Sequence, residues 1–512
     1  MPNKKRNSSF KKNLLAFAFG LIVLILSIIE LYFSGETTLF WIGFVLSILI
    51  VLPNVLWLSI GAGDSYGLKY ILTMLKTKKG INTIKSLSKR GKFFERMSAC
   101  GLCLGFGLAG VDYLVAREKK GLKRILVLLV GAILLGILFY FTMQILFALP
   151  ALASLLLFGL IGFVLFGFAG LSLVFLLGYG FISVFAAFVG RQICPSIAPV
   201  LPGVPIPGLG TIIPLIAWVS LGLILVIHEF SHGVMFAYYK QKIISVGLIL
   251  VGLIPMGAFV EQDDKEFVKL NEKKQVMILS AGPSSNLLTV PVAVIILLAF
   301  SFAVAPISTI IADEYANVYG GVQVAKTETQ VSYCGITKDA PAQGKLLPND
   351  KIISLNGVLT SNVSELNGAF YLDKNLGAPM AFVVLRDGKE ENIIIEPVVF
   401  DELGRQVIGA SFEGIPTGYA PALQVFVANI LIEAISSILF FLALLSFAVG
   451  MFNFLPADPL DGGRIAKVVL LPYFSFLGFN KKDTQKFIGR LFVWIFLISI
   501  LLNLLPYLTM IT

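Results

Sequence analysis

Long apolar stretches, separated by short basic segments, form the main pattern along the chain. An apolar stretch of about 18 residues or more is typical of a helix that spans a bilayer. We predict spanning helices at 13–33, 39–62, 125–148, two within 152–190, and at 213–238, 277–304, 424–452 and 488–511. The stretch 152–190 could instead contain one crossing and one re-entrant piece. The predicted fold is a polytopic α-helical membrane protein with about nine transmembrane helices.

Composition and charge placement also indicate a multi-pass protein of the cell membrane. Only 14% of the residues are charged and 57% are apolar, whereas soluble domains have roughly 25% charged residues. The net charge of +10 comes largely from Lys and Arg at the ends of apolar stretches, which favours cytoplasmic loops over nucleic-acid binding. We predict a cytoplasmic N-terminus and a basic cytoplasmic loop at 63–124, which contains fourteen Lys or Arg.

The region 306–423 has the opposite charge balance and a different pattern. It contains eight Lys or Arg and fourteen Asp or Glu, so we place it outside the cytoplasm. Short alternating runs at 351–356 and 381–385 are typical of strands, and the Asn-Gly and Asp-Gly pairs at their ends are turn signals. We therefore predict an inserted, β-rich, extracytoplasmic domain.

The two histidines of the chain lie in one motif, His228-Glu-Phe-Ser-His232. Positions i and i+4 share one face of a helix, so both imidazoles can reach one metal ion. Glu229 lies beside the first histidine, where it could take a proton from a water that the metal polarises. Residues 213–227 are apolar, and ionisable groups at membrane depth are costly and usually functional. We predict a metal site within the membrane.

Two histidines leave a catalytic zinc ion one protein ligand short. The best further candidates are carboxylates in the segment 453–463, which follows an apolar stretch. Two prolines and two glycines prevent a continuous helix there, and broken backbone at membrane depth needs protein or water around it. Asp458 and Asp461 are both candidate ligands on chemical grounds.

The histidine motif, followed by Asn453-x-x-Pro456 and by Asp461-Gly462, resembles the site-2 protease family of intramembrane zinc metalloproteases. The resemblance implies that Asp461 is the third ligand of one zinc ion. It also implies that Asn453 lies beside the active site, where its amide could donate to the developing oxyanion.

The family has a further Gly-Pro-x-x-Asn motif on the helix after the first ligand helix. Here it is formed by Gly282, Pro283 and Asn286, which we assign to substrate binding on the strength of the resemblance.

Two other segments invite a structural prediction. Residues 338–357 resemble part of a PDZ domain, a class that often binds an extended peptide as an added strand. The insert would then select or gate substrates, although a passive spacer is the alternative. Residues 243–262 are apolar, rich in β-branched side chains and interrupted by Gly252 and Pro255. We predict a membrane-associated β-hairpin there, with a packed re-entrant loop as the alternative.

Together these features predict an intramembrane zinc endopeptidase that cleaves membrane-spanning proteins within the lipid bilayer. Regulated intramembrane proteolysis or the clearance of signal-peptide remnants is what the resemblance implies. The alternatives are a membrane-embedded zinc protease that cuts surface or soluble peptides, and an inactive metal-binding regulator or transporter. We divide the chain into accessory helices (1–190), two parts of a catalytic core (191–305 and 424–512) and the PDZ-like domain (306–423).

Overall fold

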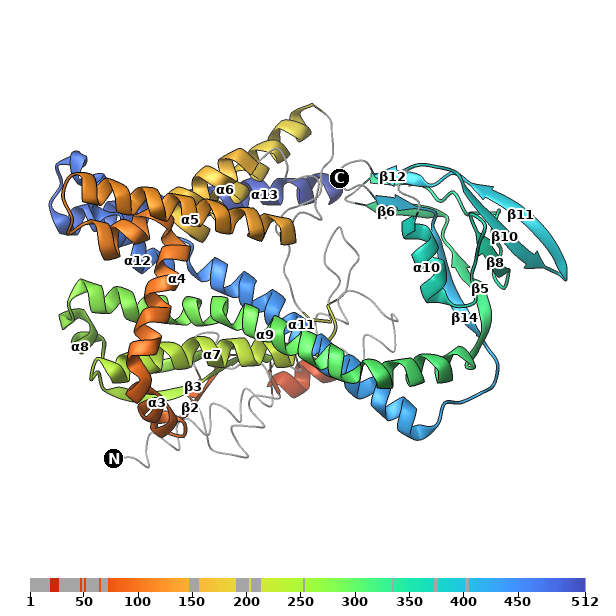
Figure 1. The fold of residues 1–512 in the computed structure, drawn as a ribbon, viewed down its shortest axis with the longest axis horizontal. Coiled ribbons are helices and arrows are strands. Elements are labelled where there is room, and N and C mark those ends of the chain that lie inside the picture. Colours follow the sequence, from red (N-terminus) through yellow and green to blue (C-terminus); the bar gives the residue numbers. More distant parts are fainter. Residues whose placement is uncertain are drawn as a thin grey trace. The chain divides into compact units, whose positions relative to one another are not determined.

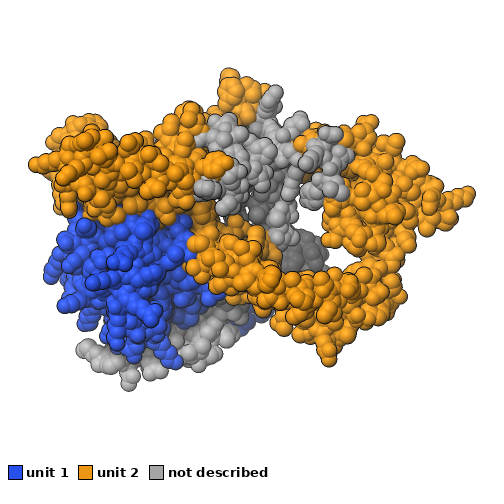
Figure 2. Space-filling model, viewed as in Figure 1, with its two compact units in different colours: residues 1–102, 221–288 blue, residues 103–220, 289–512 orange. Residues whose placement is uncertain are grey.

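The computed structural model describes most of the chain. The described residues are 19–26, 47, 50–51, 64–65, 72–146, 156–189, 202–203, 213–251, 254–333, 336–372, 376–400 and 405–511. The spans predicted at 13–33 and 39–62 lie largely outside them. The chain divides into two compact units, residues 1–102 with 221–288 and residues 103–220 with 289–512 (Figure 2).

Seven helices in the described part of the chain are long and apolar enough to cross a membrane. They are Ile81–Ala116, Leu122–Tyr140, Leu157–Ala186, Ala217–Tyr238, Glu272–Ala316, Leu423–Asn453 and Lys481–Leu505. Five of the sequence-predicted stretches, beginning at 125, 213, 277, 424 and 488, fall on such helices. The protein is therefore mostly helical, with several apolar helices suited to a bilayer and some β-sheet (Figure 1).

The first unit combines helices with a four-stranded antiparallel sheet, ordered β1-β2-β3-β4. Its strands are β1 (Asp64–Ser65), β2 (Leu72–Thr77), β3 (Ile243–Val251) and β4 (Ile254–Gln262). Strands β3 and β4 form the hairpin that the sequence predicts at 243–262. The pairing of β2 along β3, with Leu72 opposite Val251, is not foreseeable because the two strands lie far apart in the chain.

The segment 63–124 differs from the basic loop that the sequence predicts. It contains β2, α3 (Ile81–Leu87), α4 (Gly91–Val111) and a π-helical turn, η2 (Asp112–Ala116). The physical reason is visible in the charge pattern, because none of the fourteen basic residues lies between 97 and 116. With its Gly, Ala and Cys residues this span has a mean hydropathy of 1.7, lower than all of the other candidate spans except Ala217–Tyr238. The basic residues on both sides therefore made it resemble part of a polar loop.

The second unit contains α5 (Leu122–Leu146), α6 (Leu156–Phe188), α11 (Leu423–Asn453), α12 (Asp461–Val469) and α13 (Lys481–Ile511). Helix α6 breaks at Phe166–Gly167, and Gly162 then lies against Gly170 and Val174, so the chain folds back. The arm before the break has ten residues, about 15 Å of helix, which is too short to cross a bilayer. This geometry fits the alternative of one crossing and one shorter piece within 152–190.

The insert is a sheet domain with one covering helix. The main path of the sheet has the order β11-β10-β8-β5-β14, with β9 (Val358–Leu359) paired to β8. These strands are β5 (Tyr319–Thr327), β8 (Lys351–Leu355), β10 (Met380–Arg386), β11 (Lys389–Ile395) and β14 (Ala410–Pro416). Helix α10 (Val363–Leu372) lies beside this sheet (Figure 1). Its residues Leu366 and Ala369 belong to the same core as Val322, Ile352 and Phe382. Two short hairpins complete the insert, β6–β7 (Gln330–Tyr333, Ile336–Asp339) and β12–β13 (Val398–Phe400, Arg405–Val407).

A buried ion pair links two parts of this insert. Asp350 is 3% exposed, and its two carboxylate oxygens accept hydrogen bonds of 2.8 and 2.6 Å from the Arg386 guanidinium and one of 2.8 Å from the Leu347 amide. Burial acts to raise the pKa of Asp350. The hydrogen bonds from Arg386 and Leu347, together with the Arg386 charge, outweigh that effect and hold the pKa below its ordinary value.

We predict that acid weakens the insert through this pair. Because the folded-state pKa of Asp350 is lowered, the stabilisation is fully present above about pH 4 and is lost as the pH falls further. Arg386→Met should lower the free energy of unfolding of the insert by about 3 kcal/mol at neutral pH, since it leaves a buried carboxylate without its cation. Amide hydrogen exchange of β8 and β10 in the whole protein measures both effects. Equal protection in the variant and the wild type would contradict this account.

Candidate metal centre

Helix α7 (Ala217–Tyr238) carries both predicted histidine ligands on one face. His228 and His232 are both buried, and their Nε2 atoms lie 3.2 Å apart. One turn of helix separates the two residues, which brings the rings together as the sequence predicts.

Hydrogen bonding fixes the protonation of His232. Its Nδ1 atom lies 2.7 Å from the main-chain carbonyl oxygen of Ile278 on helix α9 (Glu272–Ala316). A carbonyl only accepts, so Nδ1 must carry the proton. In the neutral ring, Nε2 then presents a lone pair toward His228. Metal-binding histidines commonly have such a carbonyl partner, because it sets the tautomer and the orientation of the ring.

The side-chain amide of Asn286 on α9 contacts the other histidine. Its Nδ2 atom lies 3.0 Å from Nδ1 of His228, and its Oδ1 is buried without a hydrogen-bond partner. An amide can present either its oxygen or its nitrogen at the same position. With the oxygen toward His228, it accepts the Nδ1 proton and no longer lacks a partner. Nε2 of His228 then also presents a lone pair.

This donor set fits a divalent cation between the two rings. With the Asn286 nitrogen toward His228, the 3.2 Å contact is a hydrogen bond from Nε2 of His228 to Nε2 of His232. With the Asn286 oxygen there instead, two lone pairs would face each other and repel, unless a positive charge lay between them. Two nitrogens bound tetrahedrally at 2.0–2.1 Å from zinc would be about 3.3 Å apart. The observed spacing therefore suits a tetrahedral zinc site.

Gly282 makes the close approach of α9 to the histidines feasible. A Cβ atom at this position would lie 2.3 Å from Nε2 of His232 and 2.6 Å from Nε2 of His228. Any side chain would therefore displace the rings. We assigned Gly282, Pro283 and Asn286 to substrate binding from the sequence, whereas the structure places Gly282 and Asn286 against the two histidines.

Glu229 is held by the sheet of the same unit. Its Oε2 atom accepts a hydrogen bond of 3.2 Å from the main-chain amide of Val260 on β4. β4 is the last strand in the order of the described sheet, so the Glu229 carboxylate is fixed to the strand at this edge.

The segment after α11 folds into tight turns before α12 begins. Phe454 to Ala457 are buried, and a Cβ atom at Gly462 would lie 2.3 Å from the carbonyl oxygens of Phe454 and Leu455. A side chain at that position would push the first turn of α12 away from the segment that precedes it. The glycine after Asp461 therefore fixes where the helix starts.

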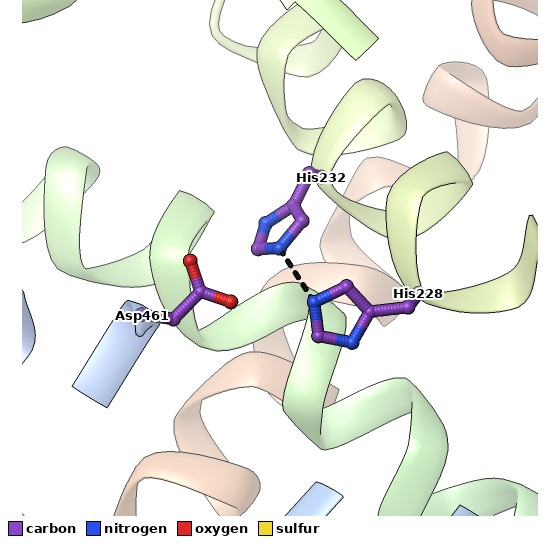
Figure 3. A group of neighbouring side chains, drawn as sticks. All are labelled: His228, His232 and Asp461. Carbon is purple, nitrogen blue, oxygen red and sulfur yellow. Dashed lines mark hydrogen bonds between the residues drawn. The ribbon is translucent and has the colours of Figure 1, made fainter. Parts of the chain in front are cut away.

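Asp461 is the first residue of α12, and its carboxylate groups with the histidines. The ligand atoms of His228, His232 and Asp461 all lie within 4.8 Å of one another (Figure 3). Asp458, the other candidate from chemistry, forms an ion pair with Lys467 instead. The geometry therefore agrees with the ligand set that the resemblance implies.

Asn453, the last residue of α11, has a partner within its own helix. Its Nδ2 atom donates to the carbonyl oxygen of Val449 at 3.0 Å. The Nδ2 group has a second N–H, which can donate to a substrate.

Comparison with known proteins identifies the family. The sequence pattern of Peptidase family M50 matches residues 216–496, which is more than half of the chain. The chain belongs to this family. It is also 27% identical over 257 residues to the uncharacterized protein MJ0971 of Methanocaldococcus jannaschii, a match that covers 50% of this chain and 58% of that protein. Peptidase family M50 comprises membrane zinc metalloproteases, so the His-His-Asp group has the donors that the family requires.

Sequence reasoning missed two features of this M50 site. It did not predict that the main-chain carbonyl of Ile278 sets the tautomer of His232. Every residue has such a carbonyl, so no sequence pattern marks the one that makes this contact. It also did not connect Asn286 with His228. The signal for that contact was available, since Gly282 and Asn286 lie four residues apart and so share a helix face.

We predict that Gly282→Ala abolishes tight zinc binding by the M50 protein. The new methyl group would displace both Nε2 atoms, so the zinc Kd should rise by a factor of about 100 or more. The matched control is Gly222→Ala on α7, where a Cβ atom meets nothing within 4 Å. Zinc competition with a chromogenic chelator measures both. A wild-type Kd for Gly282→Ala would show that the rings do not hold the metal in this geometry.

Proposed function

We propose that this M50 protein is a zinc-dependent endopeptidase that hydrolyses peptide bonds in the membrane-spanning segments of substrate proteins. The observation that carries the proposal is the donor arrangement. Two buried imidazole nitrogens and the Asp461 carboxylate lie within 4.8 Å of one another, and Glu229 directly follows the first histidine in the chain. A metal-storage or transport site needs no carboxylate in the position of Glu229.

The residues divide into metal ligands and a proton carrier. His228, His232 and Asp461 would hold zinc, which when bound polarises a water molecule and the scissile carbonyl. The Glu229 carboxylate accepts a proton from the attacking water. It then donates this proton to the nitrogen of the leaving group. The second N–H of the Asn453 amide donates to the oxyanion.

The sheet of the first unit offers a way to hold an unwound substrate. In a helical substrate each carbonyl is bonded to the amide four residues on, so the scissile bond must first be exposed. β4 forms one edge of the described sheet, and Val260 on that edge bonds Glu229. An extended segment added along β4 would replace its lost hydrogen bonds. The same pairing would bring its carbonyls toward Glu229.

We further propose that the insert is PDZ-like and selects substrates on the extracytoplasmic side. β14 lies at one edge of the path β11-β10-β8-β5-β14, and an extended peptide could pair with it. Phe412 of β14 packs against Phe382 and Phe370, so this edge is anchored on the core of the domain. A peptide corresponding to the external flank of a substrate should protect the amides of β14 from exchange.

We predict that Glu229→Gln keeps zinc and loses cleavage. The amide cannot take the proton, so the rate of peptide hydrolysis should fall by a factor of about 10²–10⁴. The zinc content should stay at one ion per chain. Glu266→Gln on helix α8 (Asp264–Lys269), at an exposed position, is the matched control and should cleave at the wild-type rate.

The experiment compares membrane proteomes that contain the wild type or the Glu229→Gln variant, and maps the cleavage sites by mass spectrometry. Single-span proteins that accumulate uncut with the variant, and cuts within apolar segments, would support the proposal. A wild-type rate for Glu229→Gln would contradict the mechanism. Cuts confined to polar segments would contradict cleavage within the membrane.

A further inference from the structure

The accessory helices before residue 190 lie outside the family match, which begins at residue 216. Part of them nevertheless contacts the stretch 454–470, which we call the ligand segment because it contains Asp461. We propose that α4 and η2 position Asp461 by holding the ligand segment at both of its ends. This inference rests on the proposed role of Asp461 as a metal ligand. All of the contacts described below lie within the second unit.

The first contact holds the start of the ligand segment. A Cβ atom at Gly105 of α4 would lie 2.3 Å from the ring of Phe454, so this ring rests directly on the helix backbone. The neighbouring Phe106 meets the same ring edge to face, with centroids 6.3 Å apart. Both phenylalanines are fully buried. Helix α4 thus forms the wall against which the segment begins.

The second contact holds the end of α12. Nη2 of Arg117 donates to the main-chain carbonyl oxygen of Val469 at 3.1 Å, and Val469 is the last residue of the helix. The final carbonyls of a helix lack partners within it, and a cation there interacts favourably with the helix dipole. Arg117 therefore caps the helix that begins with Asp461.

A buried carboxylate holds Arg117 in place. Asp112 of η2 lies 3.6 Å from Nε of Arg117 and 2.9 Å from Nη2 of Arg124. It also accepts a hydrogen bond of 3.0 Å from the hydroxyl of Tyr473, which lies in the 3₁₀ helix η5 (Leu471–Leu477) that follows α12. Burial and then the Asp112 charge raise the pKa of Tyr473 to about 12, so its hydroxyl remains a donor at neutral pH.

The two contacts can control Asp461 because the helix between them is short. Asp461 and Val469 are the ends of α12, about 12 Å apart along a helix axis. Gly462 and Gly463 pack on the backbone of 454–458, so the start of α12 cannot move without the segment before it. A catalytic metal site tolerates ligand displacements of only about 0.5 Å. Release of either end should therefore weaken metal binding.

The first test replaces Arg117. Arg117→Met should raise the zinc Kd about tenfold and lower kcat more than it changes KM, because Asp461 moves while the substrate surface does not. Arg117→Lys should recover part of the affinity, since a lysine can still donate to a carbonyl. Lys120→Met is the matched control. It removes a cation near Arg117 at an exposed position, so the zinc Kd should change by less than about twofold.

The second test is independent of catalysis and uses metal-free protein. Amide hydrogen exchange within 461–470 should be faster in Arg117→Met than in the wild type or in Lys120→Met. If Arg117→Met leaves both the zinc Kd and this exchange unchanged, the proposal is wrong. Its failure is distinguishable from failure of the protease assignment, because the exchange in metal-free protein does not depend on whether the protein cleaves peptides.

The third test concerns the contact of α4 with the start of the ligand segment. Gly105→Ala should displace the Phe454 ring and raise the zinc Kd, although alanine by itself favours a helix. Gly136→Ala on α5 is the control, because a Cβ atom there meets nothing within 4 Å. Equal zinc affinities of the two variants would overturn the role of the Gly105 contact.

Discussion

The structure depends on two histidine nitrogens that face each other within a helical protein. Ile278 forces the proton of His232 onto Nδ1, and Asn286 can do the same for His228. With both rings protonated at Nδ1, the Nε2 lone pairs would lie 3.2 Å apart, and a divalent cation between them would stabilise this arrangement. The other residues of the site hold the two rings in place, supply the third ligand (Asp461) or carry the proton (Glu229).

Glycine residues let main-chain segments pack closely against the metal site and against one another. Gly282 allows α9 to lie on the two imidazoles, and Gly462 allows α12 to start directly against the segment before it. Gly107 and Gly167 do the same for the accessory helices, since both have positive φ and a Cβ atom on Gly107 would lie 2.5 Å from the Gly167 amide nitrogen. At these positions a side chain would overlap the neighbouring main-chain atoms or the imidazoles.

The first ligand helix and the hairpin could be predicted from the sequence, because their signals are local. The histidine spacing places two imidazoles on one face of α7, and the interrupted apolar run 243–262 forms β3 and β4. The choice of Asp461 over Asp458 came from the family resemblance and not from the residues alone. The structure adds the reason that Asp458 pairs with Lys467.

The features that the sequence did not reveal depend on contacts between distant parts of the chain. The helix at 91–116 was hidden by its basic flanks, and the pairing of β2 with β3 joins segments about 170 residues apart. The bond from Arg117 to Val469 joins residues 352 positions apart. No local pattern predicts such a bond, because nothing near Arg117 differs from an ordinary basic flank of a spanning helix.

The most direct measurement of the central claim is a zinc X-ray absorption spectrum of the loaded protein and of Asp461→Cys. The account predicts two imidazole nitrogens at about 2.0–2.1 Å and no sulfur in the wild type. In Asp461→Cys it predicts the same two imidazoles and one sulfur at about 2.3 Å. A spectrum of Asp461→Cys with no sulfur shell would contradict it, because position 461 would then not lie within bonding distance of the metal.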